Sequence, residues 1–297
     1  MSIRFDGKVA VITGAGAGLG RQHALAFAAR GAKVVVNDFG GGSGSSAAAQ
    51  AVSKEIREAG GTAIANGADV ADYEQVQAMV AQAMREFGRV DILVNNAGIL
   101  RDKSFSKMDM AEFRMVLDVH LMGSAHCSKA VWDIMREQNY GRIVMTTSAA
   151  GLYGNFGQAN YGAAKLGLVG LMNVMHQEGY KKNIRVNTIA PVATTQMTAE
   201  LLPEAVHAAL QPERVTPAVL FLCSEDAPAR TIVSAAGGSF AVAAMMETAP
   251  VHFASDALTP EAIAERFASI ADWSSARSYE SASQEIQQFI TQVTGAA

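Results

Sequence analysis

Short apolar runs alternate with longer amphipathic stretches along most of the chain. The runs are rich in Val, Ile and Leu, as are strands that a parallel sheet buries on both faces; they lie at residues 8–13, 33–38, 62–66, 89–98, 142–148, 183–191 and 239–244. Between them, apolar residues recur every three to four positions, as on one face of a helix, at residues 21–31, 47–59, 76–88, 110–135 and 161–179. This alternation predicts an α/β fold with a doubly wound parallel sheet. The helix at 110–135 is expected to be long and kinked.

The last predicted strand is followed by a segment with helical periodicity. In residues 246–297, Thr259 and Pro260 have the residue types of an N-cap and a first helical position, and residues 281–293 predict a second helix. We expect residues 1–245 to form one domain. Because about fifty residues barely supply a core, residues 246–297 are expected to pack on that domain or at a dimer interface.

Glycines occupy the turn between the first strand and the first helix, at Gly14, Gly16, Gly18 and Gly20. Such a turn lets the backbone approach a pyrophosphate, whose charge the helix N-terminus favours. The second strand ends in Asp38, where a carboxylate can accept hydrogen bonds from ribose hydroxyls and would repel a 2′-phosphate. The sequence therefore predicts a dinucleotide site of the Rossmann type that binds NAD in preference to NADP. The alternative for Asp38 is a loop or capping carboxylate.

The candidate chemistry lies between Ser148 and Lys165. Tyr161 and Lys165 are four residues apart, so on a helix the phenol and the ammonium share one face. A nearby cation favours the phenolate and lowers the phenol pKa from its usual value of about 10, which makes Tyr161 a candidate general base. The Ser148 hydroxyl could hold a substrate oxygen beside it. Tyr-x-x-x-Lys also occurs by chance, and an ordinary amphipathic helix is the alternative.

Three motifs in order resemble those of the short-chain dehydrogenase/reductase family, and the resemblance covers almost the whole chain. Residues 13–20 match T-G-x-x-x-G-x-G, residues 95–98 match N-N-A-G, and Ser148 with Tyr161 and Lys165 matches the family's Ser and Tyr-x-x-x-Lys. Within the family, VVVNDFGG, NNAGILRDKSF and VHLMGS are similar to the (3R)-hydroxyacyl-CoA dehydrogenase region of type 2 peroxisomal multifunctional enzymes. The tail LTPEAIAERFASIADW resembles the end of the same region.

The resemblance implies a role for each matched residue. Tyr161 would exchange the hydroxyl proton, Lys165 would lower the phenol pKa and hold the nicotinamide ribose, and Ser148 would orient the substrate oxygen. Asp69 would hydrogen-bond the adenine ring and Val70 would contact it, the alternatives being a helix cap and a core valine. The implied NAD-binding residues are Gly14, Gly18, Leu19, Gly20, Asp38, Asp69, Val70, Asn96, Ala97, Gly98, Tyr161, Lys165, Pro191, Val192 and Thr194.

The chain departs from the family pattern at three positions. His120 stands where the family usually has an Asn that holds a water in a proton relay; an imidazole can pass a proton, and a structural histidine is the alternative. Val192 replaces a Gly beside the nicotinamide. A family Thr falls near Gln196, and Thr194 or Thr195 would take its place.

Residues 197–215 correspond to the segment that closes over substrate in the family. Their apolar side chains are expected either to line an acyl pocket or to form the inward faces of two short helices; they are Met197, Leu201, Leu202, Val206 and Leu210. Arg101 and Lys103 could meet an anionic CoA group, or belong to a solvated face.

The resemblance implies interconversion of (3R)-3-hydroxyacyl-CoA and 3-oxoacyl-CoA. The alternatives are a hydroxysteroid dehydrogenase and a 3-oxoacyl-carrier-protein reductase. From another class, a dinucleotide-binding regulator without turnover is a remote alternative that the intact Ser148, Tyr161 and Lys165 disfavour.

Composition narrows the remaining choices. At 297 residues and 49% hydrophobic, the chain can bury a sizeable core, and its formal net charge of −4 offers no basic surface for nucleic acid. Cys127 and Cys223 are too few for a disulfide framework or metal cluster. We expect no metal, no membrane contact and no signal peptide. Because the C-terminal TGAA is not the peroxisomal signal S-K-L, we expect a cytoplasmic protein.

The helices at 110–135 and 166–179 are expected to form a homodimer, with a tetramer as the alternative.

Overall fold

The predicted doubly wound α/β architecture is confirmed. The computed structural model describes residues 2–42, 44–195 and 203–294, and in them one sheet has the strand order β3-β2-β1-β4-β5-β6-β7-β8. The strands are β1 (Val9–Ile12), β2 (Lys33–Asn37), β3 (Thr62–Asn66), β4 (Ile92–Asn95), β5 (Gly141–Thr146), β6 (Ile184–Val192), β7 (Ile232–Ala236) and β8 (Ser239–Ala243).

The central strands are parallel and buried, as their continuous apolar runs predict. β1 pairs with β2 on one side and β4 on the other, with Ile12 opposite Val36 and Val94. The chain moves outward from β1 to β3 and then crosses back to β4. The loops after β1 and β4 therefore diverge at the carboxyl end of the sheet, where doubly wound folds bind their ligands.

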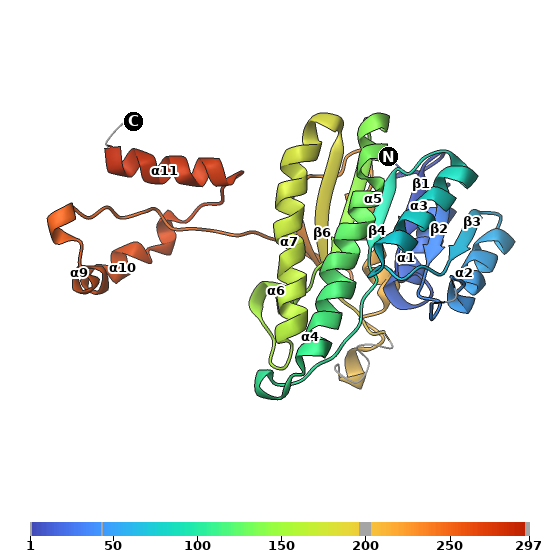
Figure 1. Ribbon diagram of the computed structural model, residues 1–297, viewed down its shortest axis with the longest axis horizontal. Helices are drawn as coiled ribbons and strands as arrows, with labels where there is room; N and C mark the ends of the chain where they lie inside the picture. Colours follow the sequence, from blue (N-terminus) through green and yellow to red (C-terminus); the bar gives the residue numbers. More distant parts are fainter. Residues whose placement is uncertain (1, 43, 196–202, 295–297) are drawn as a thin grey trace. The chain divides into compact units, whose positions relative to one another are not determined.

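Helices cover both faces of the sheet (Figure 1). One layer contains α1, α2 and α8, and the other contains α3, α5 and α7. The α-helices of this part are α1 (Gly18–Ala29), α2 (Ala47–Glu58), α3 (Tyr73–Phe87), α4 (Met110–Leu117), α5 (Gly123–Gln138), α6 (Ala149–Tyr153), α7 (Ala159–Gly179) and α8 (Thr216–Leu222). The short 3-10 turns are η1 (Phe105–Lys107), η3 (Tyr180–Lys182), η5 (Glu204–Val206) and η6 (Pro212–Arg214).

The long kinked helix expected at residues 110–135 forms as two α-helices, with a turn of another helical type between them. Between α4 and α5 lies a π-helical turn, η2 (Asp118–Met122). A π turn is wider than an α turn and places one more residue in it. The Ser124 hydroxyl donates a 2.7 Å hydrogen bond to the His120 carbonyl, which satisfies one of the carbonyls in this turn.

The sheet ends in two strands, β7 and β8, that a very short connection joins. β7 was not predicted, and it is joined to β8 by only Gly237 and Gly238, which have φ angles of 57° and 88°. A connection of two residues can return the chain only antiparallel. Glycine adopts such positive φ angles without the steric cost that a Cβ adds.

The chain divides into two compact units, Met1–Val242 and Ala243–Ala297. The second contains η7 (Ser255–Ala257), α9 (Pro260–Glu265), α10 (Phe267–Ile270), η8 (Trp273–Ser275) and α11 (Ala282–Thr294). Thr259 caps α9 as predicted, accepting a 3.1 Å hydrogen bond from the Ala262 amide. None of the described residues of this unit is buried, and Phe267 and Trp273 are more than half exposed.

The residues that the structure describes contain no candidate membrane span and no cluster of candidate metal ligands. No helix in them has both the length and the apolar character that a membrane crossing requires. No group of three or more His, Cys, Asp or Glu side chains in them is arranged to hold a metal ion.

Candidate active site

The glycine turn after β1 is locked to the Asn-Asn-Ala-Gly turn after β4. The Asn96 side chain donates to the carbonyls of Thr13 (3.0 Å) and Gly14 (3.1 Å). In return, the Thr13 hydroxyl accepts from the main-chain amides of Asn96 and Ala97 at 3.0 and 3.1 Å. A Cβ on Gly14 would lie 2.8 Å from Ala97 Cα. Only glycine therefore allows the two turns to lie this close.

Asp38 at the end of β2 is fixed against the glycine turn. Its Oδ2 accepts a 2.8 Å hydrogen bond from the Gly16 amide. A Cβ on Gly16 would meet Ala48 Cβ at 2.6 Å and the Asp38 carboxylate at 2.8 Å. The carboxylate keeps further lone pairs for hydroxyl donors, and its negative charge stands at the mouth of the turn.

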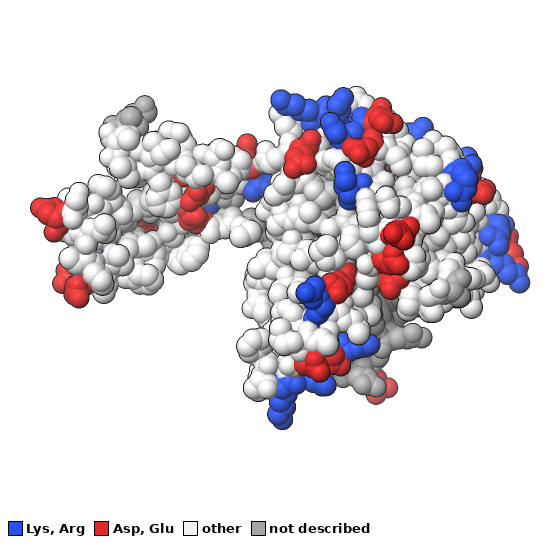
Figure 2. All heavy atoms as spheres, viewed as in Figure 1, with Lys and Arg blue, Asp and Glu red and all other residues white. Residues whose placement is uncertain are grey.

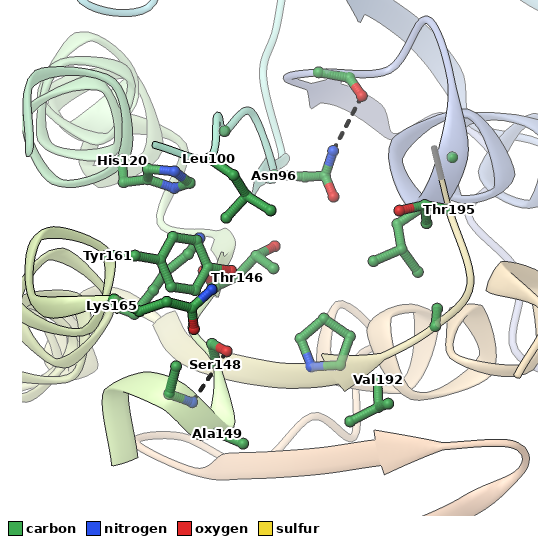
Figure 3. Close-up of a pocket in the computed structure, with 18 of the residues that line it drawn as sticks. Asn96, Leu100, His120, Thr146, Ser148, Ala149, Tyr161, Lys165, Val192 and Thr195 are labelled. Atoms are coloured by element: carbon green, nitrogen blue, oxygen red, sulfur yellow. Dashed lines mark hydrogen bonds between the residues drawn. The ribbon is translucent and has the colours of Figure 1, made fainter. Parts of the chain in front are cut away.

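A cavity of about 630 Å³ opens at this end of the sheet. In Figure 3, Tyr161, Lys165 and Ser148 lie together on one side of it, and Val192 and Thr195 lie on another. Its walls include the following residues that the sequence singles out: Gly14, Gly18, Leu19, Asp38, Asn96, Gly98, His120, Ser148, Tyr161, Lys165, Pro191, Val192 and Thr195.

Five residues of the expected NAD site are not part of the cavity wall: Gly20, Asp69, Val70, Ala97 and Thr194. Asp69 Oδ1 accepts from the Ala71 amide at 2.9 Å, which is a bond within the turn before α3, whose N-cap is Asp72. The expected contact of Asp69 with adenine stays a prediction. Val70 is buried and packs against Gly123, as a core valine would. Gly20 packs closely against the Gly14 carbonyl, so it serves the turn and not the wall.

The expected acyl-pocket segment is only partly described. Met197, Leu201 and Leu202, like Gln196, lie outside the described residues. Val206 and Leu210 are half-buried and do not line the cavity. The Leu210 carbonyl accepts a 2.7 Å hydrogen bond from the Thr194 amide, so Leu210 holds the chain that leaves β6.

Ser148, Tyr161 and Lys165 converge from two elements. Ser148 ends the β5 run and caps α6, its hydroxyl accepting from the Ala150 amide at 3.2 Å. Tyr161 and Lys165 lie one turn apart on α7, with the ammonium 5.3 Å from the centre of the phenol ring. Lys165 is buried and donates a 2.5 Å hydrogen bond to the Thr146 carbonyl.

Burial affects the ionisation of both members of this pair. Burial raises the pKa of Tyr161 above its usual value; a hydrogen bond with Ser148 lowers it and the charge of Asp102 raises it. Burial also lowers the pKa of Lys165 to about 7, so at neutral pH the side chain carries only part of its charge. Burial of the phenol therefore acts against the expected lowering of the Tyr161 pKa by Lys165, and that lowering stays a prediction.

His120 of η2 stands against the edge of the Tyr161 ring, with 5.1 Å between the ring centres. Its Nε2 lies 3.0 Å from the Ile99 amide and 2.8 Å from the Ile99 carbonyl, so the tautomer decides which one it bonds. Burial lowers the pKa of His120 to about 3, and the ring is neutral at physiological pH. The contact with Ile99 agrees with the structural alternative, and a proton relay through His120 stays a prediction.

Several polar residues of the cavity wall were not expected from the sequence. Thr146, Asn155 and Gln158 line it, together with the exposed ring of Tyr153. A signal for two of them was available in GNFGQANYG, where three amide side chains precede Tyr161 within seven residues. Amides gathered before a buried helix are candidates for a tertiary hydrogen-bond network.

Comparison with known proteins decides the family. The sequence model described as short chain dehydrogenase matches residues 8–205. The chain belongs to the short-chain dehydrogenase family. Among relatives of this dehydrogenase, peroxisomal multifunctional enzyme A of Dictyostelium discoideum is 46% identical over 297 residues, which are 99% of this chain and 66% of that protein.

Two solved structures are similar to this chain. Full-length peroxisomal multifunctional enzyme type 2 from Drosophila melanogaster matches with a TM-score of 0.83 and 38% identity over 99% of this chain and 50% of that one. A 7α-hydroxysteroid dehydrogenase complexed with NADH and 7-oxo glycochenodeoxycholic acid matches with a TM-score of 0.73 and 35% identity over 79% of this chain and 95% of that one. The expected resemblance to type 2 multifunctional enzymes is confirmed, although this chain spans only part of their length.

Proposed function

We propose that the protein is an NAD-dependent oxidoreductase that interconverts a secondary alcohol and a ketone. The observation that carries the proposal is that Ser148, Tyr161 and Lys165 face the same cavity as Asp38 and the glycine turn. A proton-transfer group and a dinucleotide cradle thus line one cavity. A regulator without turnover would not need the three polar side chains there.

The cradle fits a nicotinamide dinucleotide. The glycine turn is packed so tightly that a Cβ on Gly14 or Gly16 would clash, and the N-terminus of α1 behind it favours a pyrophosphate. When bound, the nicotinamide accepts or supplies the hydride. Asp38 would accept hydrogen bonds from the adenosine ribose, and its charge supports a preference for NAD over NADP.

The residues of the chain would manage the proton and the substrate oxygen. The Ser148 hydroxyl would hold the oxygen beside Tyr161, whose hydroxyl would donate a proton to a ketone or, as phenolate, take one from an alcohol. Because burial raises the pKa of Tyr161, alcohol oxidation is expected to speed up as the pH rises above neutral. Lys165 would hold the nicotinamide ribose and stabilise the phenolate.

The proposed substrate is a (3R)-3-hydroxyacyl-CoA, with 3-oxoacyl-CoA as the product. The relatedness to multifunctional enzymes of the type 2 class supports this choice. A hydroxysteroid is the second candidate, since a steroid dehydrogenase of known structure is 35% identical; 3-oxoacyl groups on a carrier protein are the third. Arg101 and Lys103 are exposed beyond the β4 turn and could meet CoA phosphates.

A panel of alcohols with NADH absorbance as the readout tests this assignment. Because hydride must leave one face of a fixed carbinol, the (3R) thioester should react and the (3S) thioester should not. Higher kcat/KM on steroid alcohols, or equal rates for the two enantiomers, would reject the acyl-CoA assignment and leave only the dehydrogenase class. No NADH from any alcohol in the panel would reject the enzyme proposal itself.

A homodimer is the proposed assembly, with a tetramer as the alternative. In α7, Lys165 and Glu178 are the only Asp, Glu, Lys or Arg residues, and Leu166 and Val174 are 44% and 57% exposed. Figure 2 shows few charged side chains over this helix. Such an apolar face supports pairing about a two-fold axis, and the 246–297 extension is proposed to pack on the same domain or at this interface.

Location in the cytoplasm stays a prediction that cell fractionation would test.

A further inference from the structure

The residues that precede Tyr161 are hydrogen-bonded to residues 101–103, which follow β4. Gln158 Nε2 donates a 2.7 Å hydrogen bond to Asp102 Oδ2, and Asn160 Nδ2 donates a 3.0 Å bond to the Arg101 carbonyl. The Lys103 amide donates a 2.9 Å bond to the Gly157 carbonyl. These three bonds, here called the clasp, connect positions more than fifty residues apart in sequence.

Two of the clasp side chains are buried, so their bonds cannot be exchanged for water without cost. Asn160 is 0% exposed and Gln158 is 7% exposed. Asn160 Oδ1 also accepts from the Tyr161 amide at 2.7 Å, and Gln158 Oε1 accepts from Asn155 Nδ2 at 3.0 Å. An unpaired amide at either position would carry the full desolvation penalty.

The clasp anchors a first helical turn whose N-cap residue supplies no side-chain cap. Gln158 is the N-cap residue of α7, and its side chain makes no capping bond. The first amides of a helix have no partner within the helix, and an uncapped first turn frays. Tyr161 lies in that first turn, so the position of its hydroxyl depends on whatever holds the turn in place.

We propose that Gln158 and Asn160 are positioning residues for Tyr161 and that Asp102 acts through Gln158. The proposal rests on the proposed function, in which the Tyr161 hydroxyl exchanges a proton with substrate. The clasp ties the first turn of α7 to residues 101–103. It thereby fixes the phenol relative to the turn after β4, which lines the same cavity. Asp102 is not part of the cavity wall, so it can influence turnover through the clasp or through its charge, which raises the pKa of Tyr161. Asp102→Asn separates the two, because it removes the charge and keeps an acceptor for Gln158.

The test compares Asp102→Ala, Asp102→Asn, Gln158→Ala and the Asp102→Ala/Gln158→Ala double variant in the full chain. Gln138→Ala is the matched control, because Gln138 likewise bridges two segments, with bonds of 3.2 and 2.7 Å to the Val90 amide and carbonyl, and is not in the cavity wall. The readouts are kcat and KM for the best alcohol of the panel, and hydrogen–deuterium exchange of peptides covering residues 155–165.

Both alanine variants at the clasp should lower kcat about tenfold or more, since small misplacements of a reacting group are costly. Asp102→Asn keeps an acceptor for Gln158 and should retain most of kcat. The kcat of the double variant should be no lower than that of the poorer single variant, because each single variant already removes the Gln158–Asp102 hydrogen bond. Exchange at residues 155–165 should accelerate in the alanine variants, and Gln138→Ala should change neither kcat nor this exchange.

Three results would overturn the proposal: kcat of Asp102→Ala equal to that of Gln138→Ala, additive losses in the double variant, or unchanged exchange at residues 155–165. Failure of the proposed function is distinguishable from these. If the unmodified chain reduces NAD with no alcohol, the enzyme assignment falls, and the exchange measurement, which needs no turnover, still decides whether the clasp holds the first turn of α7.

Discussion

The ammonium of Lys165 lies 5.3 Å from the centre of the Tyr161 ring and donates a 2.5 Å hydrogen bond to the Thr146 carbonyl. The cation is thus enclosed between a phenol and one main-chain oxygen, away from water. Its pKa falls to about 7 because burial disfavours the charged form. This placement makes the pair sensitive to pH in a range where few other groups titrate.

The stability of the chain without ligand should rise between pH 7 and pH 8.5. Unfolded Lys165 keeps its proton up to its usual pKa of 10.5, whereas the folded chain loses it near 7. The unfolded state therefore binds more protons in this window, and the free energy of unfolding should increase by about 1–2 kcal/mol across it. Thermal melting at a series of pH values measures this, and Lys165→Met should remove the slope. An equal slope in Lys165→Met would contradict the assignment.

Tyr161→Phe should abolish turnover and leave NADH affinity nearly unchanged. The substitution removes the hydroxyl that would exchange the proton, and it keeps the ring that packs against His120. Loss of general acid/base catalysis should lower kcat by at least ~10²-fold. Kinetics and fluorescence titration with NADH are the two measurements. A kcat near that of the unmodified chain would favour a binding protein over an enzyme.

Asp38→Ala should narrow the preference for NAD over NADP. The carboxylate would both bind ribose hydroxyls and repel a 2′-phosphate, so its removal weakens NAD binding and relieves the repulsion. The ratio of kcat/KM for the two cofactors gives the result, with Asp133→Ala on the exposed face of α5 as the control for charge. Equal kcat/KM for the two cofactors in the unmodified chain would refute the preference.

Charge introduced on the apolar helix faces should dissociate the proposed dimer. Met115 and Val174 are 46% and 57% exposed on α4 and α7, and a buried, unpaired glutamate at an interface is costly. In light scattering, Met115→Glu/Val174→Glu should give the mass of one 31.2 kDa chain and the unmodified protein twice that. Ala51→Glu, on an exposed position of α2, is the control. A monomer for the unmodified protein at micromolar concentration would end the dimer proposal.

The sequence predicted those parts of the fold that depend on local periodicity. β3 was placed at residues 62–66, where the structure has it, because a short apolar run between glycine and turn residues admits little else. β7 was missed because Ile232–Ala236 has only two large apolar residues before two glycines, a pattern that also fits a loop. The five-residue α6 is too short to show a helical period.

The candidate site was predictable where the type of a residue and its place in a motif indicate its chemical role. Gly14, Gly18, Asp38, Tyr161 and Lys165 all carry such signals, and they line one cavity. The clasp was not predictable, because Gln158 and Asn160 find their partners 56 and 59 residues away. The effect of burial on the Tyr161 pKa could not be predicted either, since burial is a property of the packed structure.

The π turn η2 also limits which length changes this region can tolerate. The turn accommodates one residue more than an α turn would, so the helices before and after it keep their directions. Deleting one residue from Asp118–Met122 would leave a regular α-helix in which the side chains of the turn itself take new directions, about 100° apart for each position. His120 could then no longer meet Ile99. We therefore expect single-residue deletions here to inactivate or destabilise the chain, and deletion scanning read by kcat and thermal melting would reveal this intolerance, whereas deletion of Gly41 or Gly42, which are exposed, should be far milder.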